Sequence, residues 1–241
     1  MGSIYKRELK SFFRTPGGYI YFAVFFAVSG FLAGFCTLES QTCSTSTYFI
    51  FLLYAFVILI PLLTMKSFAE EKRMHTEQLL LTAPVSTSGM VLAKYLSALT
   101  MFAGSMALSL VYLVPVYLFS KDNYGHYNFN LATAAGCFIA VLLVGACFIA
   151  IGVFVSSLTE NQFVAALGTI GLLLVLLVCS LVNSLIDIYA VRAVISWISI
   201  YSRFGNFTYG IFDFASALYY VSVAAVFLFL TVRIYDKRRW A

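Results

Sequence analysis

LATAAGCFIAVLLVGACFIAIGVFV, residues 131–155, is a run without a single charged side chain. It is longer than the roughly 20 residues that a helix needs to cross a hydrocarbon core about 30 Å thick. A charge at the centre of such a helix costs about 2.5–3.5 kcal/mol, whereas each Leu, Ile, Phe or Val gains about 0.3–0.6 kcal/mol. The run is therefore predicted to be a membrane-spanning helix.

The same pattern occurs five more times, at Tyr19–Leu38, Tyr48–Met65, Tyr95–Phe119, Phe163–Val182 and Phe214–Val232. Only 10% of the chain is charged and its mean hydropathy is +0.94, whereas soluble domains carry about 25% charged residues. A membrane barrel would instead alternate apolar and polar residues in segments of about 10. We expect an all-α integral membrane protein, with one domain over residues 1–241 and six transmembrane helices.

The distribution of Lys and Arg predicts the orientation. If both termini are cytosolic, three basic residues face outward, Lys121, Arg192 and Arg203. The other twelve face the cytosol: Lys6, Arg7, Lys10, Arg14, Lys66, Lys72, Arg73, Lys94, Arg233, Lys237, Arg238 and Arg239. This is the positive-inside bias of multi-pass proteins. Because these residues are dispersed along the membrane edges, the net charge of +5 does not indicate nucleic-acid binding.

The N-terminal segment, residues 1–18, is predicted to be an interfacial helix that ends in a Thr15–Gly18 turn. Apolar and basic side chains alternate at helical spacing between Ser3 and Arg14, as in helices that lie in the membrane surface. A frayed basic tail is the alternative. The residues that we assign to this helix as functional are Arg7, Glu8, Lys10, Phe12 and Phe13.

Residues 66–90 form the longest predicted cytosolic loop, and FAEEKRMHTEQLLLTAPVS, residues 68–86, is its charged part. Ser67 and Glu70 have the spacing of a capping box, and Pro84 ends any helix before it. The leucines at 79–81 beside acidic and basic residues suit docking of a short helix into a groove. A solvated charge run that marks the cytosolic side is the alternative.

Two smaller patterns complete the loops. Thr159 and Gln162 predict a second capping box, which starts the fifth span with Glu160 in its first turn. The outer loop, residues 183–213, is predicted to contain a short helix over Leu185–Ile200. The cysteines fit no metal or redox spacing, and the apolar runs offer only scattered Ser and Thr, so no metal, catalytic or cofactor site is expected. Cys36 and Cys43 either form a disulfide or are small apolar filler residues.

The loop resembles the equivalent segment of type 2 ATP-binding-cassette (ABC) permeases, in particular the small gliding-motility-associated and related branch. The matching residues are Glu70-Glu71-Lys72-Arg73, Thr76-Glu77, Leu79-Leu80 and Pro84-Val85-Ser86. Three further pieces resemble the family: Arg7–Phe13 with Pro16 and Tyr19, Ser156–Gln162, and the tail from Phe204 to Tyr220. His75 and Ala93 stand where that branch commonly has Gly, which affects the expected turn geometry.

The resemblance implies that the N-terminal helix and the first cytosolic loop meet a nucleotide-binding subunit. It makes seven loop residues candidates for coupling to that ATPase: Glu70, Glu71, Arg73, Thr76, Glu77, Leu79 and Leu80. It also implies a second permease half, identical or related, and a place in the bacterial cytoplasmic membrane. ATP and Mg²⁺ are then expected in the partner and not in this chain.

The source of energy can be argued from the residues as well. The sequence has no G-x-x-x-x-G-K-[ST] phosphate loop, so it is not expected to be an enzyme that hydrolyses ATP. Its apolar runs also lack the ionisable residues that ion-driven carriers use. We therefore expect a permease subunit, of exporter type by resemblance, that is driven by a separate ATPase. A membrane scaffold that docks a cytosolic partner through the same loop is the alternative.

Overall fold

The computed structural model describes residues 2–38, 45–74, 86–119, 131–183 and 199–240. Within these ranges the chain is helical and contains no strand. The helices are α1 (Gly2–Arg14), α2 (Pro16–Leu38), α3 (Thr45–Thr64), α4 (Ala69–Arg73), α6 (Thr87–Ser109), η1 (Leu110–Tyr112), α7 (Leu113–Phe119), α8 (Leu131–Leu158), α9 (Gln162–Asn183), η2 (Ser202–Phe204), α11 (Gly205–Thr208) and α12 (Phe214–Trp240).

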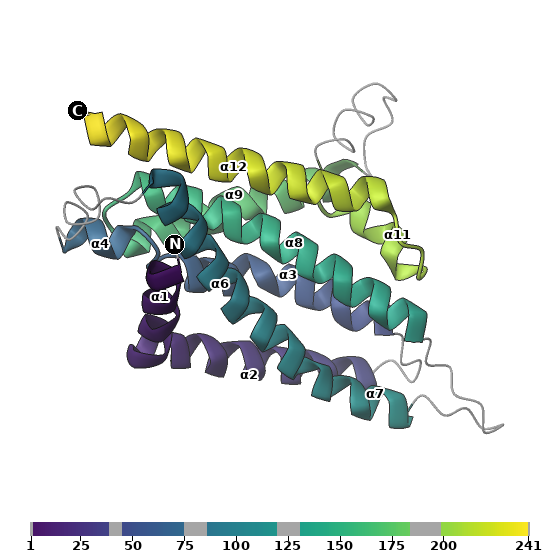
Figure 1. Cartoon of the computed structure of the whole chain (residues 1–241). Helices are drawn as coiled ribbons and strands as arrows, with labels where there is room; N and C mark the ends of the chain where they lie inside the picture. The colour runs from purple at the N-terminus through teal and green to yellow at the C-terminus, as the bar shows by residue number, and fades with distance from the viewer. Residues whose placement is uncertain (1, 39–44, 75–85, 120–130, 184–198, 241) are drawn as a thin grey trace.

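Six helical stretches are long and apolar enough to cross a membrane, namely α2, α3 with its continuation into α4, α6 with its continuation into η1 and α7, α8, α9 and α12. The prediction of an all-α membrane protein with six transmembrane helices is confirmed. The short helix α1 precedes them and runs at a steep angle to α2 (Figure 1).

Several boundaries differ from the predicted ones. The N-terminal helix ends at Arg14, and the turn predicted over Thr15–Gly18 is shorter, because Pro16 already begins α2 and proline favours the first turn of a helix. The loop predicted over 66–90 contains α4 and is already in α6 from Thr87 onward. Ser86 caps α6 by accepting a hydrogen bond from the Gly89 amide at 3.3 Å.

The start of α9 also differs from the predicted capping box. Helix α9 begins at Gln162, and Asn161 Oδ1 accepts the Phe163 amide at 2.9 Å. The hydroxyl of Thr159 is buried and does not make the predicted cap. Glu160 therefore lies before the helix and not in its first turn. Asn is as good an N-cap residue as Thr, and here Asn161 caps the helix in place of Thr159.

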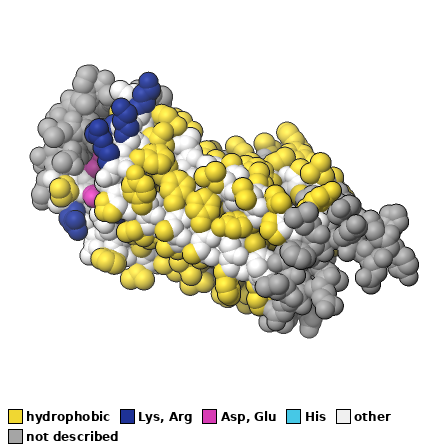
Figure 2. All heavy atoms as spheres, turned by 90° about the horizontal axis from the view of Figure 1, so that it is seen from below, with side chains coloured by type: hydrophobic (Ala, Val, Ile, Leu, Met, Phe, Trp, Pro, Cys, Tyr) yellow, Lys and Arg dark blue, Asp and Glu magenta, His cyan; other side chains and the backbone are white. Residues whose placement is uncertain are grey.

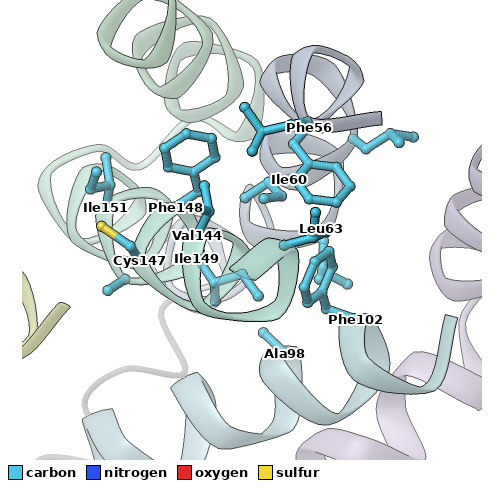
Figure 3. Packing of buried hydrophobic residues seen from close by; sticks show 14 of the residues in the cluster. Phe56, Ile60, Leu63, Ala98, Phe102, Val144, Cys147, Phe148, Ile149 and Ile151 are labelled. Atoms are coloured by element: carbon cyan, nitrogen blue, oxygen red, sulfur yellow. The ribbon is translucent and has the colours of Figure 1, made fainter. Parts of the chain in front are cut away.

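Helix α8 is the centre of the bundle, because it packs against α3, α6, α9 and α12. In Figure 3 large side chains from α3 and α6 converge on it. Phe56 of α3 and Phe102 of α6 meet edge to face with their ring centroids 5.1 Å apart, and Phe148 of α8 is fully buried beside them. Edge-to-face pairs of this kind add to the stability gained from burial.

Two glycines allow this close packing on α8. A Cβ atom at Gly145 would lie 2.2 Å from Phe102 Cε1, and one at Gly152 would lie 2.3 Å from Thr64 Oγ1. In α2, a Cβ at Gly30 would lie 3.2 Å from the Tyr112 hydroxyl oxygen of the same chain. Gly30 therefore packs within the subunit. Gly34 and Gly171 would meet nothing within 4 Å.

We expect Gly145→Ala to destabilise the protein by about 1–3 kcal/mol, because the new methyl group overpacks a core that is already full. Gly171→Ala is the matched control in α9. It should be neutral or stabilising by up to about 1 kcal/mol, since alanine favours the helix and meets open space. Thermal unfolding in detergent, followed by size-exclusion chromatography, measures both. Equal melting temperatures for the two variants would contradict the packing argument.

The two ends of the bundle differ in charge. One end, which we call the charged end, contains α1, α4, the start of α6, the α8–α9 turn and the C-terminal part of α12 (Figure 1). At the opposite end the described residues carry the charges of Arg203 and Asp213 and no others. Figure 2 shows the basic side chains gathered at the charged end and an apolar surface along the rest of that face.

The segment before α12 lies at the opposite end (Figure 1). Asp213 caps that helix: its carboxylate accepts the Ser216 hydroxyl at 2.6 Å, the Asn206 amide nitrogen at 3.0 Å and the Ala215 backbone amide at 3.0 Å. The hydrogen bonds from Ser216 and then Asn206 lower the pKa of Asp213 below its ordinary value. The predicted helix over Leu185–Ile200 and the Cys36–Cys43 pair lie largely or wholly outside the described residues.

Candidate functional site

The short helix α4 lies at the charged end, directly after α3. Its N-terminal amides are capped by a side chain from another helix. Ser156 Oγ of α8 accepts hydrogen bonds from the Phe68 amide at 3.1 Å and the Ala69 amide at 3.2 Å, and donates to the Met65 carbonyl at 3.3 Å. Ser67, the predicted cap, makes no such bond, since the N-cap residue is Phe68 and its own side chain forms no cap.

A second contact to α8 comes from Lys72. Its side chain turns inward and is buried, and its ammonium group donates to the Ser157 carbonyl near the end of α8. A lysine at a helix C-terminus satisfies a free carbonyl and interacts favourably with the helix dipole. Lys72 also lies 5.9 Å from the centroid of the Tyr235 ring of α12, and that ring packs on Phe68 at 4.7 Å between centroids.

The other side of α4 is held by four charged groups. Glu71 Oε1 lies 2.9 Å from Lys94 Nζ of α6 and 3.2 Å from an Arg7 nitrogen of α1. Glu8 Oε1 of α1 lies 3.3 Å from Lys94 Nζ and 2.8 Å from Arg7. The Lys94 ammonium also donates to the Ser67 carbonyl at 2.7 Å. Two carboxylates and two cations thus form a neutral network that joins α1, α4 and α6.

Burial strengthens the attraction between the charges of this network. The Lys94 side chain is 1% exposed, Glu8 16% and Glu71 18%, while Arg7 at 55% remains in contact with solvent. Opposite charges in so little water attract more strongly than on a surface. The hydrogen bond to Glu8 raises the pKa of the Arg7 guanidinium above its ordinary value.

Helix α1 shows the amphipathic arrangement predicted for it. Ile4 is buried, and Leu9 and Phe12 pack against the core. Phe13 is half exposed and stacks on Phe22 of α2 with centroids 6.2 Å apart. Lys10 is exposed. Glu8 departs from a surface role, because its carboxylate points inward to Lys94.

The remaining predicted coupling residues of α4, Glu70 and Arg73, are outside the ion-pair network and are at least partly exposed. Arg73 and the following Met74 are exposed, the latter at 63%. Glu70 is partly exposed and lines a small polar notch of about 40 Å³ with Glu8 and Lys66. Within the part of the chain that the structure describes, neither Glu70 nor Arg73 has an ion pair. Thr76, Glu77, Leu79 and Leu80 lie outside the described residues.

Several residues of this site were not among the sequence candidates. Lys72 and Lys94 were counted as markers of the cytosolic side, and Ser156 and Tyr235 were given no role of their own. The C-terminal part of α12 also reaches the site, since the Thr87 hydroxyl donates to Asp236 Oδ1 at 2.5 Å. The burial of Lys94 could have been suspected from the small and apolar residues that precede it in the sequence.

The fold and this site define a multi-pass membrane protein with a charged end built around one short helix. Residues 36–234 match the family described as ABC-2 family transporter protein. The chain therefore belongs to the ABC-2 family and is a membrane permease component of ABC transporters, as the resemblance predicted. No curated protein matches it. The described residues contain no group of three or more metal-binding side chains.

Proposed function

We propose that this chain is an exporter-type permease subunit, driven by a separate ATPase that binds at the charged end. The observation that carries the proposal is the way in which side chains attach α4 to the rest of the bundle. The helix is attached to α1, α6, α8 and α12 through side-chain contacts, while Arg73 and Met74 at its C-terminal end are exposed. A short helix held in this way offers its exposed end to a soluble partner and passes the partner's movement to the spans.

The orientation follows from the same end. Basic residues are concentrated there, and loops rich in Lys and Arg stay in the cytosol. We therefore place the charged end and both termini in the cytosol, in a bacterial cytoplasmic membrane. The coupling candidates Thr76, Glu77, Leu79 and Leu80 follow α4 in sequence, outside the described residues, and we keep them as candidates for contact with the ATPase.

The partner supplies the nucleotide chemistry in this proposal. The sequence lacks a phosphate loop, so ATP and Mg²⁺ bind in the ATPase subunit and no cofactor is needed in the permease. A second permease half, identical or related, completes the membrane part. An apolar cleft of about 450 Å³ between α7 and α8, lined by residues such as Leu113 and Phe138, is consistent with an amphipathic or lipid-like cargo.

The proposal is tested by purifying the tagged chain from its own membranes and identifying bound proteins by mass spectrometry. We expect a phosphate-loop ATPase whose hydrolysis rate changes when the permease is present. A bound cytosolic partner without a phosphate loop would instead support a scaffold and would contradict the proposal.

The docking surface is tested by Arg73→Glu. We expect the ATPase to bind this variant in nanodiscs about tenfold more weakly, which corresponds to about 1.4 kcal/mol of lost contact energy. Lys237→Glu is the matched control, because it reverses an exposed charge at the same end on α12. An equal loss in both variants would show a general effect of charge and not docking through α4.

A further inference from the structure

Lys94 of α6 contacts two other elements of the charged end at once. We infer that Lys94 is a positioning residue that holds α4 and α1 to α6, so that a displacement of α4 is delivered to the third span. The inference rests on the proposed function for the origin of that displacement, which is the ATPase. The attachment itself rests on the geometry of the chain alone.

The acceptors around Lys94 show this role. An ammonium group has three N–H donors, and Lys94 Nζ has three acceptors within reach: Glu71 Oε1 at 2.9 Å, Ser67 O at 2.7 Å and Glu8 Oε1 at 3.3 Å. None of them belongs to α6. Two come from the segment that forms α4, and one comes from α1. The side chain therefore crosses from its own helix to both neighbours and is saturated by them.

Packing alone does not require a lysine at this position. Its side chain is 1% exposed, and the desolvation of a buried ammonium offsets much of what its ion pairs contribute. An unbranched apolar residue of similar length would fill the same space without that cost. The ion pairs instead fix a position: the acceptors on α1 and beside α4 must stay close to Lys94 Nζ for its buried charge to remain compensated. We take this as the physical basis of the positioning role.

The other attachments of α4 lead to different helices. Ser156 and the Ser157 carbonyl hold it to α8, and Tyr235 of α12 packs on Phe68. Loss of Lys94 would thus leave α4 bound to α1 through the Arg7–Glu71 ion pair, to α8 and to α12, while weakening its connection to α6.

Helix α6 in turn is hydrogen-bonded to α2. Tyr21 and Ser105 share a buried hydrogen bond of 3.2 Å, and the hydroxyl of Tyr112, just beyond the end of α6, donates to the Phe26 carbonyl at 3.3 Å. A displacement that reaches α6 therefore has a direct connection onward to the first span.

The first experiment uses spin labels on the isolated chain, after replacement of its five cysteines. One label pair joins Met74 to Leu92 of α6, and a second joins Met74 to Lys237 of α12; all three positions are exposed. We expect Lys94→Met to broaden the distance distribution of the first pair and to leave the second unchanged. Lys94→Arg should keep both narrow.

Broadening of both pairs would show a general loss of structure, and broadening of neither would show that Lys94 holds nothing. Either result overturns the inference. If Lys94→Met gives no folded protein, Lys94→Gln is measured by the same criterion, because it removes the charge and keeps a polar group.

The second experiment uses the complex with its ATPase and a slowly hydrolysed ATP analogue, with labels at Leu92 and at Leu167 of α9. We expect the analogue to shift this distance in the wild type and in Lys94→Arg. The shift should be lost in Lys94→Met although the ATPase still binds. A shift that persists in Lys94→Met overturns the inference. If the wild type binds no ATPase, the proposed function fails, and the first experiment alone decides whether Lys94 positions α4.

Discussion

Replacing Glu71 with Lys is expected to destabilise the protein by about 3–5 kcal/mol, the range found when one member of a buried ion pair is removed and the other charge is left uncompensated. The new ammonium would lie beside Lys94 and Arg7, which are 2.9 and 3.2 Å from the present carboxylate. Three cations would then share a site with one carboxylate, that of Glu8. We expect a lower yield of monodisperse protein and a lower Tm in detergent.

The neighbouring acidic residue provides the control. Glu70→Lys makes the same change of charge one position earlier in α4, where the side chain is partly exposed and has no ion pair within the described residues. Its effect on stability should stay within about 0.5 kcal/mol. The double variant Glu71→Lys with Lys94→Glu should recover part of the loss, because opposite charges face each other again. Equal melting temperatures for the two single variants would show that the network contributes nothing.

The role of Glu71 inside the chain also affects how docking of the ATPase has to be tested. Reversal of every acidic residue in the loop would remove Glu71, and the complex would then be lost for reasons internal to the chain. Variants at Arg73, which is exposed, separate the two effects. The seven coupling candidates therefore remain predictions, and the structure assigns Glu71 an additional contact inside the chain.

The six spans were predictable because one contribution, the free energy of transfer from water into lipid, dominates their formation. Each run such as 131–155 is long and uncharged, so transfer into lipid fixes both its helical state and its location. The amphipathic pattern of residues 3–14 was predictable for a similar reason, since its apolar face repeats with the helical period. The observed ends of these helices differ from the predicted ones by a few residues, because Pro16 and Ser86 determine where α2 and α6 begin.

The contacts of the charged end were not predictable, because they join residues far apart in sequence. The local pattern at Ser67 and Glu70 indicates a capping box, yet the amides it would cap are bound by Ser156, which is 88 residues away from Phe68. Lys94 counts as one more positive charge when orientation is read from the sequence. Its burial becomes visible only when α1 and α4 are placed beside it.

Ser156→Val is expected to have the second large effect on the charged end. The change removes one hydroxyl that accepts two backbone amides, of Phe68 and Ala69, and donates to the Met65 carbonyl. Valine keeps nearly the same volume but has no polar group. A buried group that loses its hydrogen-bond partner costs about 1–3 kcal/mol, so three such groups together should cost about 3 kcal/mol or more.

Hydrogen exchange followed by mass spectrometry gives a local measurement of this change. The peptide that contains residues 66–74 should exchange faster in Ser156→Val, because the N-terminal amides of α4 lose their acceptor. Ser157→Ala is the matched control: its hydroxyl donates to the Phe154 carbonyl of its own helix at 2.6 Å, a bond whose loss leaves α4 untouched. The Ser157 carbonyl, which accepts from Lys72, is retained. Faster exchange of α4 in both variants, or in neither, would mean that Ser156 does not cap it. The hydrogen-bonded attachment of α4 to α8 within the described residues would then rest on Lys72, which donates to the Ser157 carbonyl.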